Sequence, residues 1–208
     1  MCDPEDKPQD SIPGIDAWLP WHPDEAKERL LGAAAIWCVA GGWALDLWLG
    51  RKTRPHSDLE IAALRADFAG LRERLRGFKL FVAADGELSE LPPDSRLDPG
   101  QHHIWLLDEP ARFWRLSIML EPGDVQTWVY RRDESLRCPR SQMMAATAEG
   151  VPYLNPQGVL IYKAKATRPK DEMDFNACVG VMGPAARAWL KNALIRLHPS
   201  HHWIERLN

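Results

Sequence analysis

Residues 39–46 read Val-Ala-Gly-Gly-Trp-Ala-Leu-Asp, and residues 56–61 read His-Ser-Asp-Leu-Glu-Ile. Residues 36–40, just before the glycine pair, form a short apolar run that is typical of a covered strand. Gly41 and Gly42 have no Cβ atom, so the backbone can turn sharply there and a ligand can approach closely. A helix that opens at Trp43 would direct its first amides over the glycines, where they favour a phosphate group. The stretch therefore predicts a strand, a phosphate-binding turn and a short helix.

The second part of the stretch places two acids on a following strand. Residues two apart in a strand point to the same face, so Asp58 and Glu60 project together while Leu59 and Ile61 face the core. Two neighbouring carboxylates repel each other and raise one pKa unless a cation neutralises them. Their hard oxygen atoms suit Mg²⁺ that also holds substrate phosphates. A phosphate-binding turn followed by a metal-binding acid pair indicates nucleotidyl transfer.

These residues resemble a known family. Gly41-Gly42 followed by Asp58-Leu59-Glu60 is similar to the glycine pair and acid–apolar–acid signature of the polymerase-β-type nucleotidyltransferases. The longer run over residues 41–58 resembles the aminoglycoside 2''-nucleotidyltransferases more closely. The alternative is a helix-capping glycine pair beside an acidic strand edge.

The resemblance also implies a third acid on a neighbouring strand, which completes the metal site or accepts the proton of the attacking hydroxyl. The expected strand is 113–121, where Ser117 stands at the first place to look, and serine does not ligate Mg²⁺ as a carboxylate does. Glu121 has the same strand parity as Ser117 but lies about 13 Å further along the strand. We take Glu121 as the candidate catalytic base.

Basic residues flank the predicted site on both sides. Arg54 and His56 precede the acid pair. The family resemblance favours a role in which they contact the triphosphate or orient the acids, and a solvated basic turn is the alternative. A block from Lys163 to Phe175 is similar to the helical second part of transferases related to the abortive-infection toxins. That resemblance implies that Lys163 contacts the nucleotide phosphates. It leaves Lys170, Asp171 and Asp174 as structural or cleft-wall residues, and a salt-bridged exposed helix start is the alternative for these three.

The pattern of the whole chain predicts an α/β (α+β) fold. Residues 15–137 should form a small mixed sheet with flanking helices, the nucleotidyltransferase core, after a loose lead-in over residues 1–14. Asp85-Gly86 predicts a hairpin turn between two strands. Residues 138–208 should be helical, with amphipathic helices near 157–166 and 184–197, and the active cleft should lie between the two parts.

Composition restricts the class of protein. The chain has 208 residues, a formal net charge of -3 and four cysteines without a Cys-x-x-Cys pair. Such cysteines indicate free thiols in a reducing compartment. No apolar run reaches the roughly 20 residues needed to span a bilayer. We therefore expect a cytoplasmic protein with no membrane partner.

The predicted reaction moves a nucleoside monophosphate from an NTP, with ATP expected, to a hydroxyl of an aminoglycoside-like acceptor. Asp58 and Glu60 would bind one or two Mg²⁺ ions, and pyrophosphate would be released. Two alternatives remain open. One is a toxin-type transferase acting on tRNA or protein, which needs a basic groove near Arg131, Arg132, Lys163 and Arg168. The other is a catalytically inactive nucleotide-binding module, which Ser117 motivates.

Overall fold

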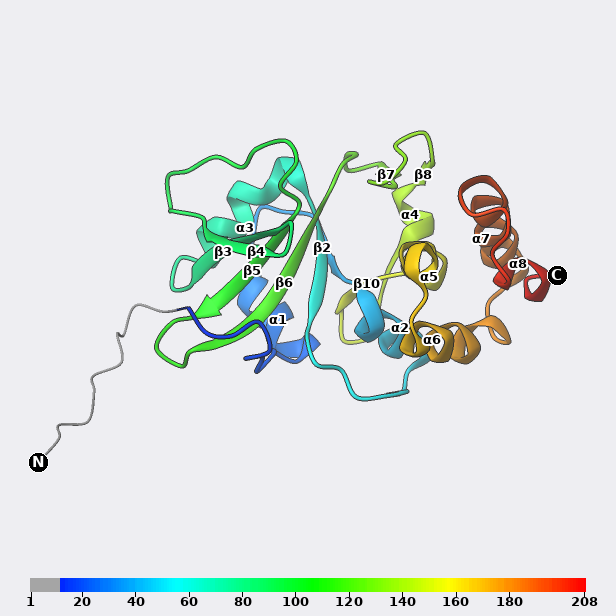
Figure 1. Ribbon diagram of the computed structural model, residues 1–208, viewed down its shortest axis with the longest axis horizontal. Coiled ribbons are helices and arrows are strands. Elements are labelled where there is room, and N and C mark those ends of the chain that lie inside the picture. Colours follow the sequence, from blue (N-terminus) through cyan, green and yellow to red (C-terminus); the bar gives the residue numbers. More distant parts are fainter. Residues whose placement is uncertain (1–11) are drawn as a thin grey trace, which may run out of the picture.

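The structure is a computed structural model that describes residues 12–208, and it is built around one mixed β-sheet (Figure 1). Eight strands form this sheet in the order β4-β3-β5-β6-β2-β1-β10-β9. Their bounds are β1 (Trp37–Val39), β2 (Glu60–Leu64), β3 (Lys79–Ala84), β4 (Glu87–Glu90), β5 (His103–Asp108), β6 (Phe113–Glu121), β9 (Met144–Ala146) and β10 (Pro152–Leu154). A separate hairpin pairs β7 (Thr127–Val129) with β8 (Arg137–Pro139).

The helices are α1 (Pro23–Leu30), α2 (Gly41–Leu49), α3 (Phe68–Arg74), α4 (Arg140–Met143), α5 (Pro156–Lys163), α6 (Pro169–Val179), α7 (Pro184–Leu197) and α8 (Trp203–Arg206), with 3₁₀ turns at Arg65–Asp67 and Ala164–Ala166. Helices α2 and α5 to α8 gather at one end of the molecule, and α3 lies at the other end beside β3 and β4 (Figure 1). The mixed sheet and these helices confirm the predicted α/β (α+β) fold class. In the part of the chain that is described, no helix has the length and apolar character to cross a membrane.

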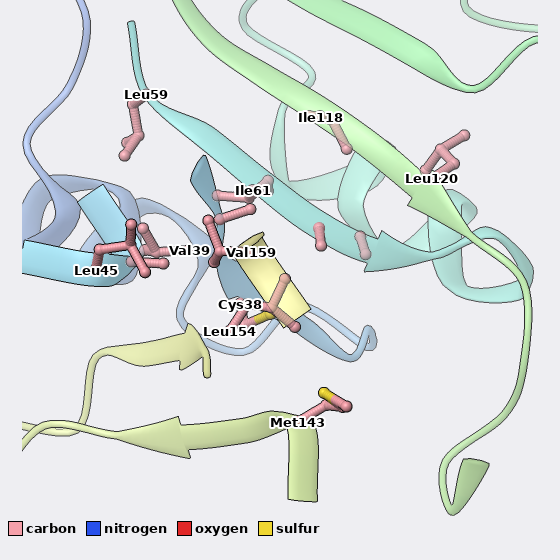
Figure 2. Packing of buried hydrophobic residues seen from close by; sticks show 14 of the residues in the cluster. Cys38, Val39, Leu45, Leu59, Ile61, Ile118, Leu120, Met143, Leu154 and Val159 are labelled. Atoms are coloured by element: carbon pink, nitrogen blue, oxygen red, sulfur yellow. The ribbon is translucent and has the colours of Figure 1, made fainter. Parts of the chain in front are cut away.

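The centre of the sheet positions the acid pair. Strand β2 runs antiparallel to β1 and parallel to β6. Val39 of β1, Ile61 of β2 and Val159 of α5 are buried in one apolar cluster beneath these strands (Figure 2). Residues 61–64 of β2 are all buried, so the strand is covered on both faces of the sheet, and only Glu60 at its start is partly exposed.

Several local predictions are confirmed. Asp85 and Gly86 form the turn between β3 and β4 with φ angles of 51° and 83°, values that favour this residue pair. Strand β6 and helix α7 have the predicted bounds. Helix α1 ends at Leu30, and Gly32 just beyond it adopts a φ of 77°, which stops the helix.

The segment 138–208 contains strands as well as the predicted helices. Strand β10 pairs in parallel with β1, with Val39 opposite Tyr153, and β9 pairs with the other side of β10. Strands of three residues between prolines carry too little periodicity to be predicted from sequence. The segment is therefore joined to the core through the sheet.

Two expectations concern the N-terminus and the cysteines. Residues 1–11 of the predicted lead-in, which include Cys2, lie outside the described residues. The other three cysteines (Cys38, Cys138 and Cys178) are free thiols, and Cys38 and Cys178 are buried.

Candidate active site

Asp58 and Glu60 line the same small pocket. Asp58 precedes β2 and Glu60 is its first residue, and both are partly buried. The pocket has a volume of about 70 Å³, and Gly42 and Trp43 at the start of α2 form part of its wall. Burial and the neighbouring Asp58 carboxylate raise the pKa of Glu60. The two acids therefore face the start of α2 across a polar cavity.

The cations Lys163, Arg168 and Lys170 also line this pocket, together with Arg54 and His56. Lys163, Arg168 and Lys170 each lower the pKa of Glu60, against the effects of burial and Asp58. The pocket thus combines two carboxylates with positive groups that could bind phosphate oxygens.

The glycine pair is needed because side chains pack against its backbone. Gly41 has a φ of 60°, and a Cβ atom there would lie 2.1 Å from Oε2 of Glu60. A Cβ atom on Gly42 would lie 2.3 Å from Nη2 of Arg54 and 2.6 Å from Cε1 of His56. Helix α2 begins at Gly41, and its N-cap residue Ala40 has no side chain that could accept a bond from the first amides.

His56 is held in place by Asp46 of α2. Nε2 of His56 lies 2.6 Å from Oδ2 of Asp46, and both side chains are almost fully buried. Oδ1 of Asp46 accepts hydrogen bonds from the amide and hydroxyl of Thr53. The ring of His56 packs on Trp43, with 4.7 Å between the centroids. Burial lowers the pKa of His56, although the hydrogen bond to Asp46 opposes this effect.

An ion network joins the acid strand to the C-terminal helices. Arg54 donates two hydrogen bonds of 2.8 and 2.9 Å to Asp174 of α6. Lys163 of α5 lies 2.9 Å from the same carboxylate and 2.8 Å from that of Asp171. Burial alone would raise the pKa of Asp171, but hydrogen bonds from Arg168 and Lys163 hold it well below its usual range. Arg54 and Lys163 thus border the pocket while each is paired with an acid.

A second, larger cavity adjoins the small pocket. It has a volume of about 360 Å³ and shares Glu60, Lys163 and Arg168 with the pocket. Its other walls come from β5 and β6, from the residues after β7, and from α5 and the turn that follows. A cavity therefore lies where residues 15–137 meet residues 138–208.

Among the residues that the structure describes, no third acid lines the pocket beside Asp58 and Glu60. Ser117 of β6 is the register partner of Glu60 and is buried. Glu121 pairs instead with Leu64, is 3% exposed, and lines neither cavity. Nε1 of Trp128 donates a hydrogen bond of 3.3 Å to Glu121, and Nη1 of Arg140 lies 3.9 Å away. Burial raises the pKa of Glu121 to about 7. The role of Glu121 as a base stays a prediction.

The residues present fit the Mg²⁺ that the family resemblance implies. Within residues 12–208, no group of three or more acidic, histidine or cysteine side chains gathers to bind a metal. Mg²⁺ keeps several waters and commonly uses one or two protein carboxylates together with substrate phosphates. Asp58 and Glu60 supply that minimum.

Sequence reasoning missed Asp46 as a functional residue. Its signal was its position in the second turn of α2, on the same stretch as the glycines. Tyr162, which lines the larger cavity, was also not selected, because no local pattern marks it.

A model of the aminoglycoside-2''-adenylyltransferase family matches residues 25–90, which contain both the glycine pair and the acid pair. No curated protein gives a match. The crystal structure of ANT(2'')-Ia in complex with adenylyl-2''-tobramycin is similar over 83% of this chain and 97% of its own, with 17% identity and a TM-score of 0.53.

Two further solved structures have lower TM-scores. The lincosamide antibiotic adenylyltransferase LnuA, bound to lincomycin, matches with 13% identity, 76% and 92% coverage and a TM-score of 0.48. An antigenic nucleotidyltransferase-like protein from Paracoccidioides brasiliensis has 16% identity, 88% coverage of both chains and a TM-score of 0.44.

The fold is similar to that of the adenylyltransferase ANT(2'')-Ia, and the family model covers the segment that carries the glycine pair and the acid pair. The chain therefore resembles the aminoglycoside nucleotidyltransferases, which confirms the resemblance seen in residues 41–58.

Proposed function

We propose that the protein is a Mg²⁺-dependent nucleotidyltransferase. It transfers a nucleoside monophosphate from an NTP, with ATP as the expected donor, to a hydroxyl of a small-molecule acceptor, and it releases pyrophosphate. One observation carries the proposal: Asp58 and Glu60 share a polar pocket with the start of α2 and with four cations, Arg54, Lys163, Arg168 and Lys170. A cytoplasmic location also stays a prediction.

Each group in the pocket has a chemical part in this reaction. Asp58 and Glu60 would hold Mg²⁺, which would neutralise charge on the phosphates. Gly41, Gly42 and the amide of Trp43 would bind the terminal phosphates. Lys163 binds phosphate oxygens, and the ion pair between Lys163 and the α6 carboxylates keeps its ammonium group in position.

Pyrophosphate release with each NTP and Mg²⁺ tests the proposal. We expect Asp58→Asn and Glu60→Gln to abolish turnover, because a neutral amide does not replace a carboxylate as a Mg²⁺ ligand. Both variants should keep the circular dichroism spectrum of the folded protein. Glu28→Gln, an exposed change on α1, serves as the matched control and should keep full activity. Unchanged turnover in both acid variants would remove the metal assignment.

The two alternatives are separated by the choice of acceptors. Arg131, Arg132, Lys163 and Arg168 line one cavity, which favours a toxin-type transferase acting on tRNA or protein as the second candidate. An inactive nucleotide-binding module is motivated by Ser117 opposite Glu60. A panel of aminoglycosides, lincosamides and tRNA tests the acceptors. NTP binding without turnover on any of them would favour the inactive module.

A further inference from the structure

Three cations of the larger cavity have no acidic partner. Arg131, Arg132 and Lys165 line it, and within residues 12–208 no carboxylate oxygen lies within ion-pair distance of any of them. Arg131 contacts Nε2 of His103 at 3.4 Å, and Arg132 donates a hydrogen bond of 2.7 Å to the carbonyl of Tyr162. These partners are neutral groups. Arg131 also lowers the pKa of the buried Glu121, but the two side chains form no ion pair. The cations at this end of the cavity therefore have no carboxylate in direct contact.

The acids in the larger cavity do not change this balance. Asp171 is already paired with Lys163 and Arg168. Glu60 lies at the other end, where the small pocket begins. A polycationic aminoglycoside would meet like charges here, and an uncharged nucleobase would leave the cations unpaired. The charge balance favours an anionic group.

The strand register shows how far the cationic end of the larger cavity lies from the acid pair. His103 pairs with Met119, and Glu60 pairs with Ser117, two residues earlier on β6. The cationic end therefore lies about 7 Å beyond the acid pair along the strand direction. A cavity of about 360 Å³ is of the size that holds small molecules. A short phosphorylated alcohol can span from this end to the acids.

We propose that Arg131, Arg132 and Lys165 bind a phosphate group of the acceptor, which is then a small phosphorylated alcohol and not a polycationic antibiotic. This inference rests on the proposed function. The acceptor hydroxyl oxygen forms a bond to the α-phosphorus of the NTP, and the bond from that phosphorus to the bridging oxygen breaks. Pyrophosphate leaves with the electron pair, and the hydroxyl proton passes to water.

The test compares acceptors that differ only in the phosphate. Pyrophosphate release is measured with ribose 5-phosphate against ribose, with glycerol 3-phosphate against glycerol, and with tobramycin and a short RNA. We expect KM at least about tenfold lower for each phosphorylated compound, because a charge-assisted hydrogen bond is lost without the phosphate. A preference for ribose, glycerol or tobramycin overturns the proposal. A preference for the RNA over both phosphorylated sugars also overturns it.

Substitutions of the three cations test whether they bind a phosphate of the acceptor or the phosphates of the NTP donor. Lys165 is exposed, so Lys165→Gln should fold normally and raise KM for ribose 5-phosphate about tenfold while KM for the NTP stays unchanged. Arg131→Gln provides a second variant with the same expectation. Arg74→Gln, an exposed change on α3, is the matched control and should alter neither constant. A rise in KM for the NTP alone would assign the cations to the donor and overturn the proposal.

A binding measurement separates this inference from the proposed function. Calorimetric titration of ribose 5-phosphate into the protein, with Mg²⁺ and a non-hydrolysable ATP analogue, requires no turnover. If no acceptor is turned over, the proposed function fails, but binding that is about tenfold weaker in Lys165→Gln still supports the phosphate site. Equal binding by Lys165→Gln and by the unaltered protein overturns it.

Discussion

Replacing Glu121 by glutamine should stabilise the protein at neutral and alkaline pH. The carboxyl group is 3% exposed, and its neighbours are Trp128 at 3.3 Å and Arg140 at 3.9 Å. Hydrogen bonds from Trp128 and Tyr162 and the cations Arg140 and Arg131 do not offset the loss of water around the carboxylate. Burial therefore raises the pKa of Glu121 to about 7 in the folded protein.

The size of the effect follows from the raised pKa of Glu121. Its pKa rises from 4.5 to about 7, which corresponds to about 3 kcal/mol at roughly 1.4 kcal/mol for each pKa unit. Because the folded pKa lies above the unfolded one, this contribution to stability is fully present below pH 4.5 and is lost as the pH rises through 7. Glutamine does not titrate, so the Glu121→Gln variant lacks this loss.

Urea unfolding at several pH values measures the effect. The free energy of unfolding of the variant, minus that of the unaltered protein, should increase by about 3 kcal/mol over the window from pH 4 to pH 8. The same difference for Glu28→Gln, an exposed control on α1, should stay flat. Parallel pH curves for Glu121→Gln and the unaltered protein would refute the reasoning. Turnover by the same Glu121→Gln preparation also tests the role of Glu121 as the base. If Glu121 is the base, the variant should lose most of its activity, whereas a buried structural group can be replaced without that loss.

Two further substitutions test the packing around the acid pair. Gly42→Ala should lower stability by about 1–3 kcal/mol and weaken NTP binding, because the new Cβ displaces Arg54. Thermal unfolding measures the change in stability, and calorimetry measures the change in NTP affinity. Gly180→Ala, which has open space around it, should change neither stability nor NTP affinity. Asp174→Asn should destabilise the fold by about 3–5 kcal/mol, because two buried cations, Arg54 and Lys163, lose their shared carboxylate. Since these cations lower the pKa of Asp174, the difference in unfolding free energy should shrink as the pH falls below about 4, and a constant difference contradicts the assignment.

Local sequence signals were sufficient to predict much of the fold. The Asp85-Gly86 turn, the bounds of β6 and the start of α7 at Pro184 each depend on neighbouring residues, and each is confirmed. The strand β10 depends instead on its pairing with β1, more than a hundred residues earlier in the chain. No local pattern carries that information.

The candidate site likewise has features that local sequence predicts and features that depend on tertiary packing. The spacing of Asp58 and Glu60 predicted that they would act together, and both line one pocket. The sequence did not predict that Arg54 binds Asp174, since 120 residues separate them. It also did not predict that Gly42 is required by side chains, because their approach depends on tertiary packing.

The C-terminal segment is the electrostatic counterpart of the acid pair. Asp58 and Glu60 come from the core strand, whereas Lys163, Arg168 and Lys170, which lower the pKa of Glu60, come from the segment 138–208. Without α5 and α6 in place, two neighbouring carboxylates would lack these cations and repel each other.

The same segment is fixed to the core by charge and by the sheet. Arg54 reaches Asp174 from the loop before the acids, and β10 pairs with β1 directly beside the start of α2. Asp174 also holds Lys163, so one buried carboxylate sets the positions of a core cation and a helix cation together. Any change that moves α6 away from the core therefore alters the charge facing Glu60, and on the proposed function we expect it to change the affinity for phosphate and metal as well.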